Sequence, residues 1–227
     1  KCRLARMYAA FAILRKRVFV NKRMRLKVKI RIFDTVVIAN GLYGCAIWNI
    51  NKEQMDKLDS WKFRHLKTIM GIKWQDYCSY AILINKIRNY NIDIDTMEAT
   101  IRRRRCSYLG HVCRMPNTRY PKIMLHAEVN LGKRSVGGPE VSYRSCIKND
   151  LESFSINVGG NFKALESMAK NRGMWQKLVR DGSEAFMDSW LQKELKASFE
   201  RFLPEFLATY DYSLLGKPTE DFVEDTY

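Results

Sequence analysis

The chain has 227 residues, of which 46% are apolar and 28% charged, a composition that excludes wholesale disorder and allows one large domain or two small ones. Its most apolar run, residues 36–48, is shorter than a membrane span and contains Asn40, so we expect no membrane partner. The net charge of +16 points instead to a polyanionic partner.

Spacing of apolar residues predicts helices along most of the chain. A first helix is expected at about residues 3–19, and a second, more buried one at 26–48, where apolar residues recur every three to five positions. Asn51 and Gln54 have the spacing of a capping box, which predicts a helix that begins there and ends at Gly71.

Further helices are expected in the second half of the chain. The pattern predicts one at about 94–115, which ends before Pro116, then helices at 141–154, 162–179 and 184–202. Residues 130–140, rich in glycine and serine, read as a loop. No period-two pattern persists, so the expected fold is mainly α: a helical bundle followed by a smaller helical carboxy-terminal region.

Charge is distributed unevenly along the sequence, and the changes in the balance of basic and acidic residues suggest three regions. Residues 1–76 carry 18 basic and 5 acidic side chains, residues 77–180 carry 18 and 8, and residues 181–227 carry 4 and 11. We therefore expect a basic helical bundle at 1–76, a carboxy-terminal helical region at 77–180 and an acidic helical tail at 181–227. The tail could fold back on the basic face.

Two cationic clusters are candidate nucleic-acid contacts. Residues 1–33 contain 12 Lys or Arg and no acid, so salt bridges within this segment cannot neutralise them. Clustered cations that release counterions from phosphates are the electrostatic footprint of a nucleic-acid binder. A generic solvated basic face is the alternative. The candidates in the first cluster are Arg15, Lys16, Arg17, Lys22, Arg23, Arg25, Lys27 and Lys29, and those in the second are Arg102, Arg103, Arg105 and Arg114.

The second cluster lies on a helix whose apolar stripe faces elsewhere, so its arginines are expected to stay available. Four aromatic residues could stack on bases, but their helical spacing among apolar neighbours makes a place in the core the preferred interpretation. These residues are Tyr43, Trp48, Trp61 and Trp74.

Catalytic and metal-binding patterns are largely missing from the sequence. No phosphate-binding glycine loop or nucleophile elbow is present. Cys106, His111 and Cys113, with His126 beyond, could offer ligands to zinc, but their spacing matches no common zinc motif, and the two cysteines read more simply as small buried residues. Six cysteines without a CxxC pair, and no uninterrupted apolar leader, favour an intracellular chain, nuclear or cytoplasmic.

Six separated strings nevertheless follow the order of one family. Leu42-Tyr43-Gly44 with Trp48, and Gly71-Ile72-x-Trp74, resemble the segment after the palm in reverse transcriptases of non-LTR (LINE-type) retrotransposons. Leu109-Gly110-His111-Val112-x-Arg114-Met115 resembles the same family's "LGHV.RM" helix. Gly132-x-Arg134, the stretch from Tyr143 to Leu151, and Arg172-x-x-Trp175 continue the match to about residue 180.

The resemblance implies a polymerase-thumb-like bundle and the region that follows it. Such a thumb would grip the RNA and DNA of a template–primer duplex next to an upstream palm domain, mainly through backbone contacts. The family's Tyr/Phe-x-Asp-Asp motif has no counterpart here, so the Mg²⁺ of polymerisation would belong to the palm and no cofactor is expected in this chain. Four positions depart from the pattern: Gly138, Tyr143, Ser145 and Asn171.

A second function remains open on the sequence alone. A basic helical bundle can bind acidic protein partners without any affinity for nucleic acid. Salt-dependent binding to any duplex would favour the first interpretation, and a stoichiometric protein complex the second.

Overall fold

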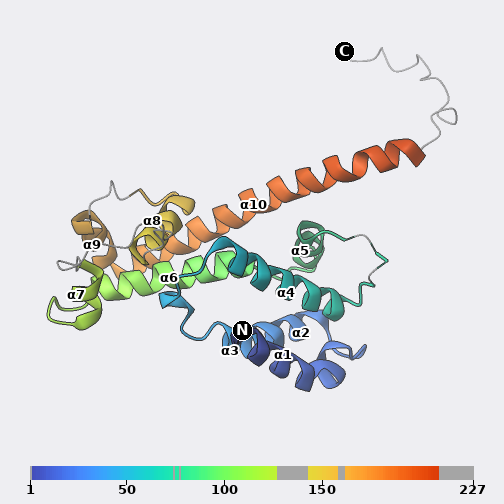
Figure 1. Cartoon of the computed structure of the whole chain (residues 1–227), viewed down its shortest axis with the longest axis horizontal. Helices are drawn as coiled ribbons and strands as arrows, with labels where there is room; N and C mark the ends of the chain where they lie inside the picture. Colours follow the sequence, from blue (N-terminus) through green and yellow to red (C-terminus); the bar gives the residue numbers. More distant parts are fainter. Residues whose placement is uncertain (1, 74, 77, 127–142, 158–161, 210–227) are drawn as a thin grey trace, which may run out of the picture.

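The computed structural model describes residues 2–73, 75–76, 78–126, 143–157 and 162–209 (Figure 1). Every regular element in these ranges is helical, which confirms the expected mainly α bundle. The loop expected at 130–140 and Trp74 lie outside the described residues. The α-helices are α1 (Cys2–Leu14), α2 (Leu26–Ile32), α3 (Ala39–Gly41), α4 (Lys52–Met70), α5 (Tyr80–Arg88), α6 (Met97–Cys113), α7 (Tyr120–His126), α8 (Tyr143–Ser153), α9 (Phe162–Lys170) and α10 (Arg172–Thr209).

The amino-terminal helices form a pair joined by a tight turn. Helix α1 continues as a π-helical segment, η1 (Arg15–Phe19), which matches the helix expected at 3–19. After the turn, α2, the π-helical η2 (Phe33–Ile38) and α3 are continuous, so the second expected helix is present as far as Gly41. Its predicted extension to 48 is wrong, because Gly44 takes a left-handed φ of 71° and a short 3₁₀ turn, η3 (Cys45–Ile47), follows.

Helix α4 begins and ends where its sequence signals place it. The Asn51 side chain accepts a hydrogen bond from the Gln54 backbone N–H at 2.9 Å, and the Gln54 side chain accepts one from the Asn51 N–H. Gly71 ends the helix in the left-handed conformation. The apolar stripe of Met55, Leu58 and Leu66 is buried, as expected.

Helix α6 is the central element (Figure 1). The long helix α10 packs along it, while α4 and the amino-terminal helices lie on its other side. The two hydrophobic cores meet on α6, because Ile101 belongs to the amino-terminal core and Leu109 to the carboxy-terminal one. Met187 and Leu191 of α10 enter the amino-terminal core, so the residues after 181 are packed onto the bundle at this point.

The helices after residue 160 divide differently from the prediction. The break lies at Asn171, whose side chain accepts a hydrogen bond from the Met174 N–H at 3.1 Å and so caps α10. Helix α10 then continues through Gly182, where two separate helices were expected. A Cβ atom at Gly182 would lie 2.8 Å from the Phe154 backbone oxygen, so this glycine permits close packing and does not end the helix. The sequence analysis also predicted no helix at the positions of α5 and α7.

A half-buried carboxylate joins three helices near the start of α6. Asp59 of α4 accepts hydrogen bonds from the Met97 N–H at 2.8 Å and from the Tyr80 hydroxyl at 3.2 Å. Burial raises the pKa of Asp59 to about 6, although the hydrogen bond from Met97 opposes the shift. The ionised carboxylate therefore costs stability at neutral pH even as it caps α6.

This raised pKa predicts a pH-dependent stability. As pH falls through 6 toward 4, the folded state binds a proton before the unfolded state does, so the contribution of Asp59 to stability increases. Asp59→Asn keeps the acceptor oxygen and removes the titration. Between pH 8 and pH 4.5 we expect the wild type to gain up to about 2 kcal/mol of unfolding free energy relative to Asp59→Asn, measured in urea titrations. Asp56→Asn, at an exposed position of α4, controls for net charge, and parallel profiles for all three proteins would contradict the assignment.

Gly110 allows α10 to approach α6. The Trp175 indole N–H donates to the Cys106 carbonyl oxygen at 3.1 Å, which fixes the ring, and a Cβ at Gly110 would lie 2.2 Å from its Nε1. We expect Gly110→Ala to lower the free energy of unfolding by about 1–3 kcal/mol in chemical denaturation. Gly173→Ala in the exposed first turn of α10, with Asn171 Oδ1 at 3.7 Å, should cause no loss. Equal stabilities of the two variants would show that this packing is not tight.

Candidate nucleic-acid interface

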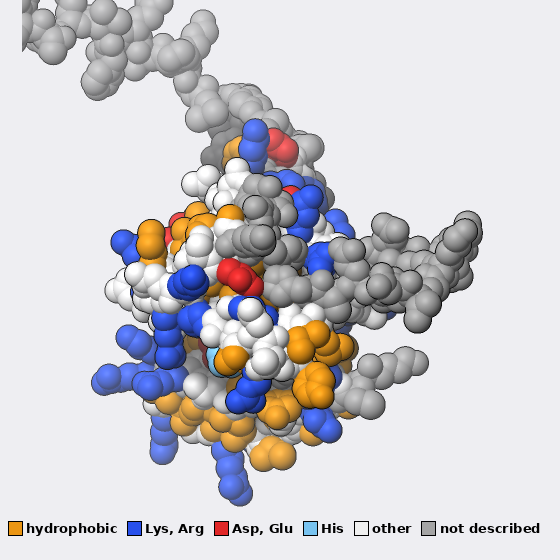
Figure 2. Space-filling view, turned by 90° about the vertical axis from the view of Figure 1, so that its left-hand side faces the viewer, with side chains coloured by type: hydrophobic (Ala, Val, Ile, Leu, Met, Phe, Trp, Pro, Cys, Tyr) orange, Lys and Arg blue, Asp and Glu red, His pale blue; other side chains and the backbone are white. Residues whose placement is uncertain are grey.

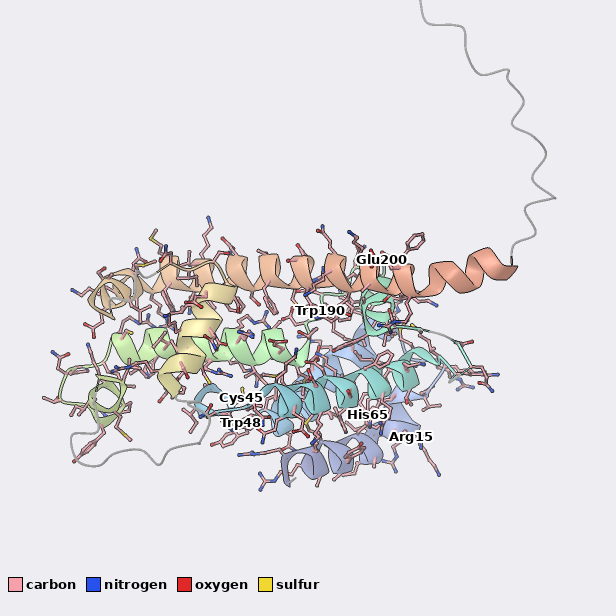
Figure 3. The ribbon with its side chains drawn as sticks, turned by 45° about the horizontal axis from the view of Figure 1, so that its top comes forward. Arg15, Cys45, Trp48, His65, Trp190 and Glu200 are labelled. Carbon is pink, nitrogen blue, oxygen red and sulfur yellow. The ribbon has the colours of Figure 1, made fainter. Side chains whose placement is uncertain are left out.

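Seven of the eight amino-proximal candidate cations lie exposed on one short stretch of structure. They occupy η1, the turn that follows it and the first residues of α2. We call this set the cationic edge, and Arg15 in Figure 3 marks its position at the carboxy-terminal end of α1. Its members are Arg15, Lys16, Arg17, Lys22, Arg23, Arg25 and Lys27.

The turn in the cationic edge is held by Asn21. The Asn21 side-chain amide donates to the Arg17 carbonyl oxygen at 3.3 Å, and its Oδ1 accepts from the Arg23 N–H at 3.0 Å. The Arg15 carbonyl oxygen accepts a further hydrogen bond from the Val20 N–H at 3.0 Å. These contacts use backbone atoms of the basic residues, so their side chains remain free to meet a ligand.

No carboxylate neutralises the cationic edge within the part of the chain that the structure describes. None of its seven side chains forms an ion pair or a hydrogen bond with another described residue. Figure 2 faces the other end of the molecule, on the side of α7 and α9, and shows that Lys and Arg side chains are present over the lower part of that face as well. A cationic surface of this kind attracts phosphates.

Helix α4 extends this positive region. His65 is buried, its Nδ1 lies 2.7 Å from the Trp61 carbonyl oxygen, and it packs edge-on against the rings of Tyr8 and Phe11. Burial lowers the pKa of His65, and the positive charges of Arg64 and Arg15 lower it further. Arg64 is exposed and shares this field with Arg15, so the structure adds it beside the cationic edge. The sequence did not predict Arg64 as a candidate contact, because the spacing of residues does not show that α1 and α4 are in contact.

Lys29, the eighth candidate, lies differently from the other seven. It is 8% exposed on the inner side of α2, and its aliphatic stem packs within the amino-terminal bundle. We therefore leave Lys29 out of the cationic edge.

The second candidate cluster is engaged within the protein, so the expectation that its arginines stay available is wrong. Arg102 Nη1 lies 3.0 Å from Asp150 Oδ1, and Arg105 Nη1 lies 3.1 Å from Asp150 Oδ2. Arg105 is only 3% exposed. Burial raises the pKa of Asp150 to about 6, while the two guanidinium groups oppose the shift. This cluster of buried charges joins α6 to α8.

Arg103 and Arg114, the remaining members of this cluster, also have partners within the protein, although the Arg103 side chain is 40% exposed. Arg103 pairs with Asp95 at 2.8 Å, and Arg114 donates to the Ala169 carbonyl oxygen at 2.8 Å. Arg104 donates to the Leu42 carbonyl oxygen at 3.3 Å and so joins α6 to the turn before η3. The helical pattern places these side chains away from the first core, but it could not show that α8, α9 and η3 cover them.

The aromatic candidates are divided between the core and the surface. Trp61 is buried and stacks on His65, as expected, and Trp48 is half-buried. Tyr43 is 75% exposed, so its expected place in the core is wrong. The turn at Gly44 ends the helical register on which that expectation depended.

The cysteine and histidine residues do not assemble a zinc site in the described residues. Cys106 and Cys113 are buried, and burial raises the pKa of the Cys113 thiol to about 11, which disfavours the thiolate that zinc needs. His111 is exposed, and the side chain of His126 lies outside the described part. No group of three potential metal ligands comes together in that part.

A groove of about 350 Å³ lies between α1 and α4. Leu4, Tyr8 and Trp61 line it together with both signs of charge, including Asp56 and Arg64. This mixture sets the groove apart from the uniformly positive cationic edge. None of the helices that the structure describes is long and apolar enough to cross a membrane.

Comparison with protein-family models, curated proteins and solved structures finds no match to this chain. The resemblance to non-LTR reverse transcriptases therefore depends on the sequence strings alone. Several of these strings meet in space: Gly110 packs against Trp175, and the Tyr143 hydroxyl donates to the Ala46 carbonyl oxygen at 3.1 Å, beside Tyr43-Gly44. Packing within this fold is enough to explain why these residue types occur at these positions, whatever the ancestry of the chain.

The buried Asp150 predicts a large structural effect of its removal. Asp150→Ala would leave the buried Arg105 without a carboxylate, while Arg102 would keep Glu98, so we expect the free energy of unfolding to fall by about 3–5 kcal/mol. Glu152→Ala, in an exposed pair with Lys148 on the same helix, should cost less than about 1 kcal/mol. Urea denaturation of both variants measures the difference. Similar losses would mean that Asp150 does not hold the second cluster in place.

Proposed function

We propose that this chain binds nucleic-acid duplexes by gripping their phosphates with the cationic edge. One contrast carries the proposal: the second cationic cluster is paired or bonded inside the fold, whereas the cationic edge has no partner among the described residues. Seven exposed like charges on one turn repel one another. A polyanion would relieve that repulsion and release its own counterions.

The resemblance gives this binding a context. We propose that the chain is the thumb and carboxy-terminal part of a non-LTR retrotransposon RNA-directed DNA polymerase, acting beside a palm domain that supplies the catalytic aspartates and Mg²⁺. In that setting the cationic edge holds the RNA–DNA template–primer by shape and backbone. The order and spacing of the six family-like strings along the sequence support this context. A reading frame upstream of Lys1 with a Tyr/Phe-x-Asp-Asp motif is the expected finding, and an unrelated upstream frame would count against it.

A charge-removal variant tests the phosphate grip. Arg15→Gln, Arg17→Gln and Arg23→Gln together remove three exposed cations whose side chains form no hydrogen bond or ion pair with another described residue. We expect the triple variant to bind a blunt 20-base-pair RNA–DNA hybrid at least about tenfold more weakly at 0.1 M salt. The slope of log K against log salt should fall by up to about 0.9 for each lost contact, equally for unrelated sequences.

The control variant removes the same charge elsewhere. Arg172→Gln, Lys177→Gln and Lys193→Gln lie at exposed positions of α10, on the other side of α6 from the cationic edge (Figure 1). This triple should keep most of the affinity. Equal losses of affinity in the two triple variants would show that net charge alone causes the effect. Unchanged binding by the Arg15, Arg17 and Arg23 variant would refute the proposed interface. Tight binding to an acidic protein with none to a hybrid would favour the protein-partner alternative.

A further inference from the structure

Tyr43 is an exposed aromatic ring on a rigid turn. The turn is fixed by the Cys45 N–H, which donates to the Leu42 carbonyl oxygen at 3.1 Å, and by Arg104, which binds the same oxygen from α6. From the other side the Tyr143 hydroxyl of α8 binds the Ala46 carbonyl oxygen. The backbone under Tyr43 is therefore held from two helices, although the ring itself is 75% exposed.

A guanidinium group lies beside this ring. The Arg3 Cζ is 5.9 Å from the centre of the Tyr43 ring and 5.5 Å from that of Trp48. Arg3 forms no ion pair with a described residue, and its Nη1 is buried without a hydrogen-bond acceptor. The site thus combines an open aromatic face with a positive charge that no carboxylate of the described chain neutralises.

Such a combination suits a nucleotide from an unpaired strand. A base stacks on an aromatic face whatever its identity, and a nearby arginine favours the phosphate attached to it. A paired base inside a duplex cannot present its face in this way, because its neighbours in the stack cover it. Blunt duplex ends offer a single pair, whereas an overhang offers free bases.

The distance between Tyr43 and the cationic edge is one that a single bound nucleic acid can span. Arg3 and Arg15 are at opposite ends of α1, about 18 Å apart at 1.5 Å per residue, and Figure 3 shows Arg15 at one end and Trp48 toward the other. A single strand with about 3.4 Å per nucleotide covers that distance in roughly five nucleotides. A duplex held by the cationic edge can therefore extend its unpaired strand to Tyr43.

We propose that Tyr43, supported by Arg3 and Trp48, is a stacking site for a base of the single strand that extends from a bound duplex. The proposal rests on the duplex-binding function above. It adds a preference for junctions between paired and unpaired nucleic acid, with little dependence on base sequence.

The test compares a blunt RNA–DNA hybrid with hybrids that carry an eight-nucleotide overhang of either RNA or DNA. We expect the overhang to raise the affinity of the wild-type protein about fivefold or more. Tyr43→Ala should lose this gain and bind the blunt hybrid normally, whereas Tyr43→Phe, which keeps the ring face, should retain it. Tyr120→Ala removes another exposed ring, 80% exposed on α7, and should retain the gain as well.

The outcomes separate this proposal from the one on which it rests. A gain that survives in Tyr43→Ala, a gain lost in Tyr43→Phe, or no gain in the wild type would overturn the stacking site while blunt binding stays intact. Loss of blunt binding in the Arg15, Arg17 and Arg23 triple concerns the cationic edge alone. A gain with an RNA overhang but not a DNA one, or the reverse, would keep the site and identify the strand that it takes.

Discussion

The buried contact between Asp150 and the guanidinium groups of Arg102 and Arg105 organises much of this structure. Arg102 has a second carboxylate partner in Glu98 of its own helix. Arg105, only 3% exposed, cannot be buried without a carboxylate, since an unpaired charge in the interior costs several kcal/mol. Asp150 supplies it and thereby docks α8 on α6. With α8 in place, the Tyr143 hydroxyl donates to the Ala46 carbonyl oxygen within η3, while Arg104 of α6 binds the Leu42 carbonyl oxygen before it. These two contacts hold the backbone on either side of Tyr43 and Gly44.

The same reasoning explains the surface. Three carboxylates of the described chain have partners within the protein. Asp150 pairs with Arg105 of α6, Asp95 pairs with Arg103, and Asp59 accepts a hydrogen bond from the N–H of Met97 at the start of α6. The acid-free segment 1–33 receives none of them within the described residues, and the seven cations of the cationic edge are exposed to water. The position of a cation relative to these carboxylates therefore decides whether it is paired or exposed in the described structure.

The sequence predicted what depends on local signals. The capping box at Asn51, the left-handed Gly71 and the exposed run from Arg15 to Lys27 all follow from residue type and short-range spacing. Prediction from the sequence failed where a contact between residues far apart in the chain determines the position of a side chain. Gly182 resembles a helix stop and serves close packing against Phe154, while Arg105 resembles a free cation until α8 brings Asp150 to it. Tyr43 was misplaced because Gly44 interrupts the helical register.

The central claim is that one cationic cluster is reserved for a phosphate backbone while the other holds the fold together. Acylation of lysines, mapped by mass spectrometry with and without a blunt RNA–DNA hybrid, measures this directly, because Lys16, Lys22 and Lys27 are exposed on the cationic edge and Lys177 and Lys193 on α10. The account predicts strong protection of the first three by the hybrid and little change at the other two. Uniform protection at all five, or protection confined to α10, would contradict it.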